Sequence, residues 1–238
     1  MIKLDDNILE EIHLHASREA PREACGVVVV HKGKHAFRPC RNISENITDF
    51  IINPEDWAEA EDFGTIILVV HSHVNINPQP SQADLVGCEN SGLPWLIVNW
   101  PNKTTHYFEP SGYKAPLVGR VFSQGILDCF TVIQDYYKDG LNIILPNPSF
   151  RTEKWWEKGE DNYVNNAPLW GFTRVDKPQL HDVILMRIGA SVSNHAVIWL
   201  GNGTILHHQF GRLSSIDVYG GWYKKISTHI FRHKDVLI

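Results

Sequence analysis

Residues 71–84 read HSHVNINPQPSQAD, and this stretch is the most informative one for the fold of the first half of the chain. The apolar run 66–70 just before it predicts a buried strand, so that His71 and His73, two residues apart, point to one face of that strand. The prolines and asparagines of the next ten residues require the chain to turn away. Order returns at Ser81, which starts a helix that carries Asp84 in its first turn.

These residues allow two explanations. Two histidines and a carboxylate that converge from a strand end and a helix start form a three-ligand zinc site, with the fourth position open as in catalytic zinc sites. Taken singly, Ser81 and Asp84 also fit a capping box, and His71 and His73 fit ordinary residues of a strand end. The joint spacing favours the metal site.

The spacing His-x-His, ten residues, Asp, with a serine three positions before the aspartate, resembles the JAMM metallopeptidases. That family also uses a glutamate beside its first core strand, which corresponds to Glu23 in the segment APREACGVVVV. The resemblance implies that Glu23 takes a proton from water and that Ser81 donates a hydrogen bond to the oxyanion. It also implies zinc as the cofactor, with the ligands His71, His73 and Asp84.

The second half of the chain contains a cysteine at a predicted helix start. Cys129 precedes the helical run FTVIQDYYK, where the helix dipole lowers the pKa of a thiol, although a core cysteine would have the same apolar neighbours. Residues 194–208, NHAVIWLGNGTILHH, predict a β-hairpin. A three-residue loop places His207 on the same face as His195, whereas a two-residue turn places His208 there. Periodicity does not choose between the two.

A cysteine at a helix start, followed by a histidine on a later strand and a polar residue twelve positions on, resembles the NlpC-type cysteine peptidases of papain-like fold. These enzymes cleave the stem peptides of bacterial cell walls. The resemblance implies that Cys129 is the nucleophile, His195 the general base and His207 the residue that orients the imidazole. Some members have a tyrosine about a dozen residues before the cysteine, where this chain has Leu117.

The pattern of predicted elements changes near the middle of the chain. Helices at 6–18, 54–63 and 81–90 alternate with strands at 27–30, 65–70 and 93–100, which indicates an α/β layer domain. After the turn-rich segment 109–116, helical stretches at 127–138 and 153–165 precede a run of strands. We therefore expect domains at 1–112 and 113–238: a JAMM, deaminase-like three-layer α/β domain followed by a papain-like α+β domain.

Composition excludes several classes of partner. The chain has 238 residues, a formal charge of −5 and a pI near 6.2, which predict no binding to nucleic acid. Its apolar runs are too short to span a bilayer, and its start lacks a signal-peptide pattern, so we expect no membrane insertion. The four cysteines form no Cys-x-x-Cys pair, which predicts a reducing compartment.

A JAMM domain followed by an NlpC-type domain resembles the tail assembly protein K family of lambda-like phages over essentially the whole length. The family implies a protein of the host cytoplasm and the virion tail tip, which acts on peptidoglycan stem peptides in the periplasm, at a γ-D-glutamyl bond to a diamino acid. Implied partners are other tail-tip proteins, by analogy one with a ubiquitin-like domain. The alternative is a non-catalytic assembly factor whose two folds serve as binding surfaces. The absence of a signal peptide argues against a host cell-wall enzyme.

Overall fold

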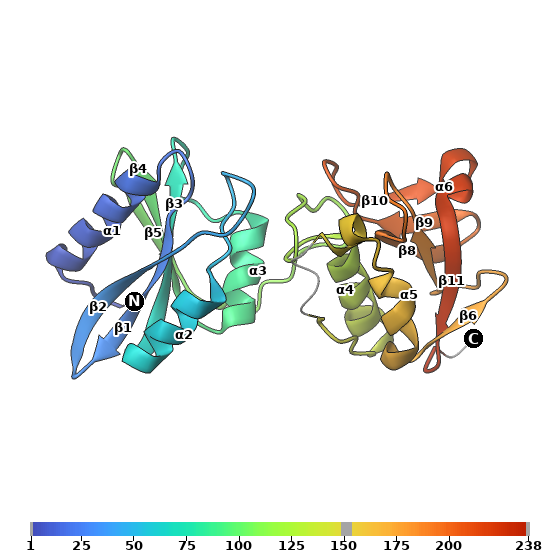
Figure 1. Cartoon of the computed structure of the whole chain (residues 1–238), viewed down its shortest axis with the longest axis horizontal. Coiled ribbons are helices and arrows are strands. Elements are labelled where there is room, and N and C mark those ends of the chain that lie inside the picture. Colours follow the sequence, from blue (N-terminus) through green and yellow to red (C-terminus); the bar gives the residue numbers. More distant parts are fainter. Residues whose placement is uncertain (1, 149–153, 237–238) are drawn as a thin grey trace. The chain divides into compact units, whose positions relative to one another are not determined.

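The computed structural model describes residues 2–148 and 154–236 and divides the chain into two compact units, Met1–Lys114 and Ala115–Ile238 (Figure 1). Residue 153, the first of the stretch 153–165, lies outside the described residues. Within the described residues, every helix is too short or too polar to cross a bilayer.

A five-stranded sheet forms the centre of the N-terminal unit, in the order β2-β1-β3-β4-β5. Only β3 and β4 pair in parallel; the other neighbours are antiparallel. The strands are β1 (Cys25–His31), β2 (Lys34–Cys40), β3 (Thr65–Val74), β4 (Trp95–Trp100) and β5 (Thr105–Phe108).

Helices cover both faces of this sheet. Helix α1 (Asp6–Glu19) packs on the face that carries Leu68 and Val70, whereas α2 (Pro54–Phe63) and α3 (Gln82–Ser91) lie on the face that carries Val69 and Trp95 (Figure 1). Because side chains alternate along a strand, the residues that follow Val69 at every second position of β3 also face α2 and α3. These are the two histidines of the HSH motif.

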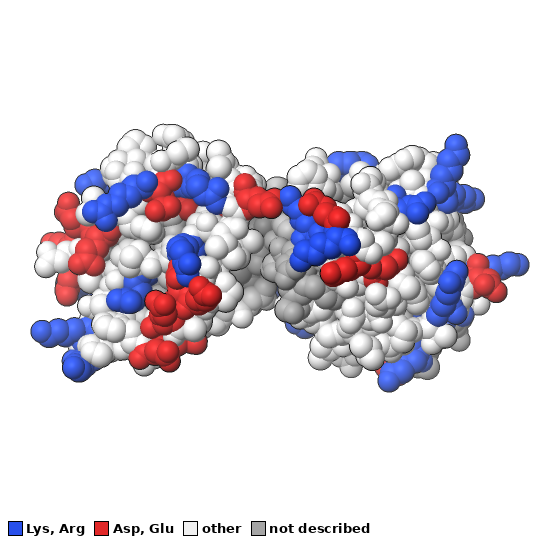
Figure 2. Space-filling model, viewed as in Figure 1, with Lys and Arg blue, Asp and Glu red and all other residues white. Residues whose placement is uncertain are grey.

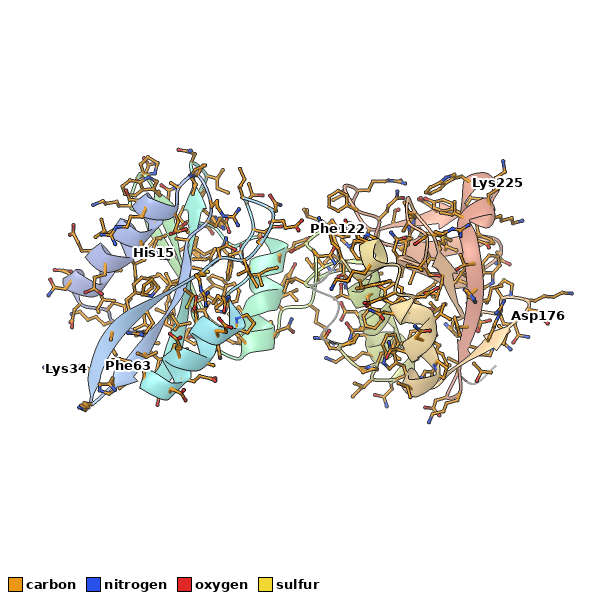
Figure 3. All side chains as sticks on the ribbon, viewed as in Figure 1. His15, Lys34, Phe63, Phe122, Asp176 and Lys225 are labelled. Atoms are coloured by element: carbon orange, nitrogen blue, oxygen red, sulfur yellow. The ribbon has the colours of Figure 1, made fainter. Side chains whose placement is uncertain are left out.

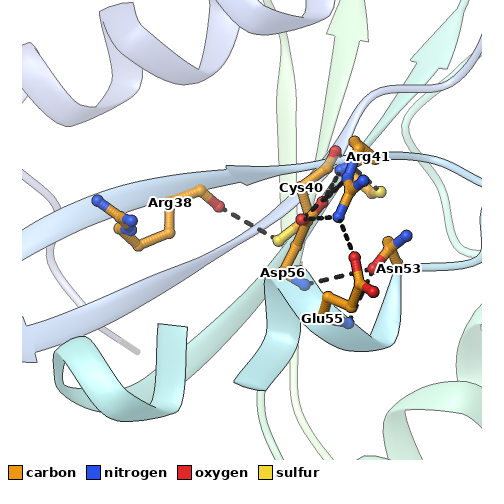
Figure 4. A network of polar contacts seen from close by, with 7 residues as sticks. Arg38, Cys40, Arg41, Asn53, Glu55 and Asp56 are labelled. Atoms are coloured by element: carbon orange, nitrogen blue, oxygen red, sulfur yellow. Dashed lines mark hydrogen bonds and ion pairs between the residues drawn. The ribbon is translucent and has the colours of Figure 1, made fainter. Parts of the chain in front are cut away.

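The loop between β2 and α2 is tied at both ends. The Arg41 guanidinium lies 2.7 Å from a carboxylate oxygen of Asp56 and 2.9 Å from one of Glu55 (Figure 4). The Asn53 side chain caps α2 by accepting hydrogen bonds from the backbone N–H groups of Glu55 and Asp56. The Asp56 carboxylate also accepts from the Arg41 backbone N–H, so the cap and the Arg41 contacts together hold this end of the loop.

The C-terminal unit contains a six-stranded antiparallel sheet in the order β10-β9-β8-β7-β11-β6. Helix α4 (Cys129–Leu141) packs against β8, and its apolar face joins the core through Val132 and Ile133. The strands are β6 (Phe172–Val175), β7 (Val183–Met186), β8 (His195–Gly201), β9 (Thr204–His207), β10 (Ser215–Val218) and β11 (Ser227–His233).

Short helical segments complete this unit. The 3₁₀ helix η2 (Trp155–Lys158) and helix α5 (Asn162–Asn166) occupy most of the stretch where the sequence predicts a helix, and η3 (Ala167–Trp170) and α6 (Gly221–Ile226) follow. The predicted fold class is confirmed, since a three-layer α/β unit precedes an α+β unit. Acidic side chains gather over α2, while both charge signs mix elsewhere on the visible face (Figure 2).

Candidate functional site

Three side chains of the N-terminal unit converge beside the end of β3. The His71 Nε2 lies 3.3 Å from the Nε2 of His73 and 3.1 Å from the Oδ1 of Asp84. The other carboxylate oxygen of Asp84 lies 3.5 Å from the Nε2 of His73. All three side chains are buried. Of the His, Cys, Asp and Glu side chains in residues 2–148 and 154–236, these form the one group of three that could hold a metal.

The spacing of these atoms fits zinc. Zinc bonds of about 2.0–2.1 Å with tetrahedral angles place ligand atoms about 3.3 Å apart. The Nδ1 of His73 lies 2.8 Å from the backbone oxygen of Asn77, which accepts its proton and leaves a lone pair on Nε2. The donor set therefore suits a metal ion.

Burial and the Asp84 carboxylate have opposing effects on the pKa values of the two histidines. The His71 ring stacks on Phe50 at 4.5 Å and meets Trp95 edge-on, and burial lowers the pKa of His71 so that it stays neutral. Burial opposes protonation of His73 too, but Asp84 and the Asn77 carbonyl raise the pKa of His73. Neutral imidazole is the form that binds metals.

The capping role of Ser81 is present as well. The Ser81 Oγ accepts from the backbone N–H of Asp84, and the Asp84 carboxylate accepts from the Ser81 N–H at 2.7 Å. The two explanations of Ser81 and Asp84 are therefore compatible, because the capping box holds the carboxylate that faces the histidines.

Glu23 is buried just before β1, with an exposed fraction of 5%. The Ser72 Oγ accepts a hydrogen bond from the backbone N–H of Ala24, which places Glu23 beside the strand end that carries the histidines. Burial, with the charges of Asp84 and Asp49, raises the pKa of Glu23 to about 9. The sequence analysis missed Asp49, which comes from the loop between β2 and α2.

The Asn42 side chain ties this loop to Glu23. Its amide nitrogen donates to the backbone oxygens of Glu23 at 2.8 Å and Asp49 at 3.0 Å. Its oxygen accepts from the backbone N–H groups of Ser44 and Ile51. One partly buried amide therefore organises the loop that carries Phe50 and Asp49 to the site.

In the C-terminal unit, Cys129 and His195 line a cavity of about 310 Å³, within the range of small-ligand sites. Cys129 is the first residue of α4, whose cap is Asp128. The Tyr163 hydroxyl lies 3.7 Å from the Cys129 Sγ. Trp155 and Trp156 also line the cavity. Phe122, labelled in Figure 3, is another lining residue.

The hairpin of β8 and β9 turns at Asn202-Gly203, where both residues have positive φ, 50° and 75°. By itself this two-residue turn would place His208 on the face of His195. One extra residue in β8, Leu200, forms a bulge and restores the register of a three-residue loop. His207 therefore shares a face with His195.

A line of hydrogen-bonded groups runs from His195 to the edge of the sheet. The His195 Nε2 lies 3.1 Å from the Nδ1 of His207, and the His207 Nε2 lies 3.1 Å from a carboxylate oxygen of Asp217. The Tyr223 hydroxyl donates to the same oxygen at 2.6 Å. His208 lines the cavity, but its ring nitrogens make no hydrogen bond to the residues that the structure describes. The sequence analysis did not identify Asp217 or Tyr223.

The pKa shifts along this line keep both imidazoles neutral. Burial lowers the pKa of His195 to about 3, with a further contribution from the two neighbouring histidines. Burial also lowers the pKa of His207, although Asp217 opposes this. Burial disfavours the charged form of Asp217, yet hydrogen bonds from Tyr223 and His207 lower its pKa. The line therefore ends in a carboxylate.

Comparisons with known proteins agree with both resemblances. Residues 5–109 match the family of prokaryotic homologs of the JAB domain, and residues 119–232 match the NlpC/P60 family. Tail tip assembly protein K of Escherichia phage N15 is 38% identical over 235 residues, covering 96% of this chain and 95% of that protein. Its counterpart in Escherichia phage lambda is 35% identical over 187 residues, covering 77% and 89%. The crystal structure of a JAB1/MPN domain protein from Archaeoglobus fulgidus is similar at a TM-score of 0.30 and 19% identity, covering 47% of this chain and 92% of that one.

Proposed function

The chain belongs to the tail tip assembly protein K family, with a JAB unit followed by an NlpC/P60 unit, and on this basis we propose that its C-terminal unit is a cysteine peptidase. Its substrate would be the stem peptide of bacterial peptidoglycan, at a γ-D-glutamyl bond to a diamino acid. The observation that carries the proposal is the cavity that Cys129 and His195 both line, with His207 hydrogen-bonded to the Nε2 of His195.

The arrangement can perform acyl transfer. The Cys129 sulfur attacks the carbonyl carbon while His195 takes the thiol proton, and the bond to the leaving amine breaks as His195 returns that proton. Water then hydrolyses the thioester, with His195 as the base. The backbone N–H of Cys129, at the start of α4, contributes to the oxyanion hole. His207 holds the imidazole in place during both steps.

For the N-terminal unit we propose a zinc-dependent peptidase or isopeptidase acting on a tail protein. His71, His73 and Asp84 would hold the ion, and when bound it supplies a Lewis acid that polarises a carbonyl and acidifies water. Glu23, buried beside the strand end that carries the histidines, would accept the proton of the water and return it to the leaving amine. Ser81 donates a hydrogen bond to the oxyanion.

The experiment for the cysteine site uses the full-length chain and purified Gram-negative sacculi. Wild type should release soluble stem-peptide fragments, identified by mass spectrometry, and Cys129→Ala should release none. Lys114→Ala, which changes an exposed residue at the boundary of the units, serves as the control. A folded wild-type protein that is as inert as Cys129→Ala would contradict the proposal.

The names of the relatives favour a second function, since both are called assembly proteins. In this function the two units bind other tail-tip proteins during assembly, without chemistry, in the host cytoplasm and then at the virion tail tip. Complementation of a phage that lacks the gene separates the two functions. Particles that form with Cys129→Ala and His71→Ala, but not after deletion of either unit, would show that binding suffices.

A further inference from the structure

The edge strand β10 has the reverse of the usual orientation. An edge strand of an antiparallel sheet buries its apolar side chains and exposes its polar ones. In β10, Ile216 and Val218 are 53% and 75% exposed, whereas the Asp217 side chain between them is only 22% exposed. The strand therefore turns its carboxylate, rather than its apolar residues, toward the face of the sheet that carries the catalytic imidazole.

The pairing of the strands explains how the carboxylate reaches that face. Asp217 lies opposite Ile205 in β9, and His207 lies two residues beyond Ile205 on the same face. The Asp217 carboxylate accepts from Tyr223 at 2.6 Å and lies 3.5 Å from the Arg212 guanidinium. These neighbours keep it ionised beside His207.

An ionised carboxylate fixes the protons of both rings. A carboxylate can only accept, so the His207 Nε2 that faces Asp217 carries the proton. Burial keeps His207 neutral, so its Nδ1 is an acceptor, and the Nε2 of His195 must donate to it. The Nδ1 of His195 is then unprotonated, in the ring that lines the cavity with Cys129.

We propose that Asp217 is a positioning residue of the cysteine site: it fixes, through His207, the tautomer of His195 that can accept the thiol proton. This inference rests on the proposed peptidase function. When the proton moves from the Cys129 sulfur to the Nδ1 of His195, the ring becomes a cation. The negative charge of Asp217 then stabilises that cation through the intervening His207, as a carboxylate does behind a single catalytic histidine.

The direct test is the position of the ring protons, measured by long-range ¹H–¹⁵N NMR on the full-length protein. His195→Gln and His207→Gln assign the two rings. In wild type both rings should carry their proton on Nε2. Asp217→Ala should populate the other tautomer in both rings, and Asp217→Glu should restore the wild-type pattern. A wild-type His207 protonated on Nδ1, or ring signals unchanged in Asp217→Ala, would overturn the proposal.

The rate of Cys129 alkylation by iodoacetamide near neutral pH gives a second readout. It should fall about 10- to 100-fold in Asp217→Ala, by analogy with the losses seen when hydrogen-bond partners of metal-bound histidines are removed. Asp176→Ala removes a carboxylate from an exposed turn of the same unit (labelled in Figure 3) and should keep the wild-type rate. Equal rates in wild type and Asp217→Ala would also overturn the proposal.

If Asp217→Ala does not fold, Tyr223→Phe replaces it. This variant removes one donor from the carboxylate and should lower the alkylation rate by a smaller factor while both rings keep their protons on Nε2. An alkylation rate of Tyr223→Phe below that of His207→Gln would contradict a path through His207. Failure of the peptidase function is distinguishable. A wild-type protein that shows the expected ring protons but releases nothing from sacculi would contradict the proposed substrate and leave the proposed role of Asp217 intact.

Discussion

The four thiols of the chain have different surroundings. Burial raises the pKa of the Cys40 and Cys88 thiols to about 11, and it raises that of Cys25 still further. Each of these three lies in the apolar core between the sheet and its helices. Cys129, in contrast, lines a cavity with His195.

We therefore expect iodoacetamide to modify Cys129 first. At neutral pH the other three thiols are almost fully protonated, and the thiolate is the reactive form. Mass spectrometry of tryptic peptides after a short exposure should find one modified cysteine in the native protein. After the same exposure, Cys129→Ala should show no modified cysteine. Equal labelling of Cys88 would show that Cys129 is not activated.

Glu23 gives the N-terminal unit a pH-dependent stability when zinc is absent. Its pKa in the folded state is about 9, above the ordinary 4.5, because of burial and the charges of Asp84 and Asp49. A raised pKa means that the folded state binds the proton more tightly, so the stabilising contribution is complete below 4.5 and is lost as the pH rises toward 9.

Urea unfolding in EDTA should show this as a midpoint that falls as the pH rises from about 7 to about 9, because the lowered pKa values of His13 and His71 act in the opposite direction only below 6.5. Glu23→Gln keeps the shape of a protonated carboxyl without its titration, so its midpoint should vary less. A wild-type midpoint that rises over the same range would contradict the assignment. Saturating zinc should also flatten the wild-type curve, since a cation favours the carboxylate.

The spacing of residues in the sequence is enough to predict some residues of the two sites but not others. His71, His73 and Asp84 belong to one short motif, so their convergence follows from strand alternation and the helix start. The position of Asp217 does not follow from such a motif. The alternating residues of β10 predict that Ile216 and Val218 are buried and that Asp217 is exposed, which is the opposite of what the structure shows. The sequence pattern does not identify Asp49 either, since a hydrogen bond from the Asn42 side chain in the same loop sets the path of the backbone there.

At the scale of elements, central strands could be predicted and edge strands could not. The central strands β1, β3 and β4 are buried on both faces and appear in the sequence as continuous apolar runs. The edge strands β2 and β5 contain few buried residues and no continuous apolar run, and β2 contains a proline, which in a sheet is tolerated mainly at an edge.

Strand ends and registers were equally hard to predict. The sequence analysis ends β3 at residue 70, but the strand continues to Val74, because polar residues that line a site read as a loop. The hairpin register depends on the Leu200 bulge, which joins a two-residue turn to the pairing expected for a three-residue loop. Hydrophobic periodicity predicts neither the end of β3 nor the Leu200 bulge.

The loop between β2 and α2 depends on Asn42, and we expect Asn42→Ala to destabilise the N-terminal unit by about 1–3 kcal/mol. The substitution removes two donated and two accepted hydrogen bonds and leaves partly buried backbone groups without these partners. Urea unfolding measures the loss. Because the loop also carries Phe50 against the His71 ring, zinc affinity should fall too.

The matched control is Asn102→Ala, in an exposed turn of the same unit. It should change the free energy of unfolding by about 0.5 kcal/mol or less, as surface substitutions usually do. Equal effects of Asn42→Ala and Asn102→Ala would show that the loop is held by other contacts, such as the Arg41 ion pairs.

At the scale of the whole molecule, the chain contains two independent sets of cores. Residues such as Leu68 and Val69 build the cores on the two faces of the five-stranded sheet, and residues such as Val132 and Ile198 build that of the C-terminal unit. No core cluster of the described residues contains members of both units. Each unit can therefore unfold as its own cooperative transition.

Zinc should separate these two transitions, because a ligand stabilises only the unit that binds it. At a free zinc concentration about 100 times the dissociation constant, linkage predicts about 2.7 kcal/mol of added stability for the N-terminal unit and none for the other. Differential scanning calorimetry of the full-length protein should show one transition that moves upward with zinc and one that stays. His73→Ala should abolish the shift while leaving the second transition in place, since that substitution removes a ligand from only one of the two units. A zinc-dependent shift of both transitions in wild type would mean that the units unfold together, and a shift retained in His73→Ala would place the ion elsewhere.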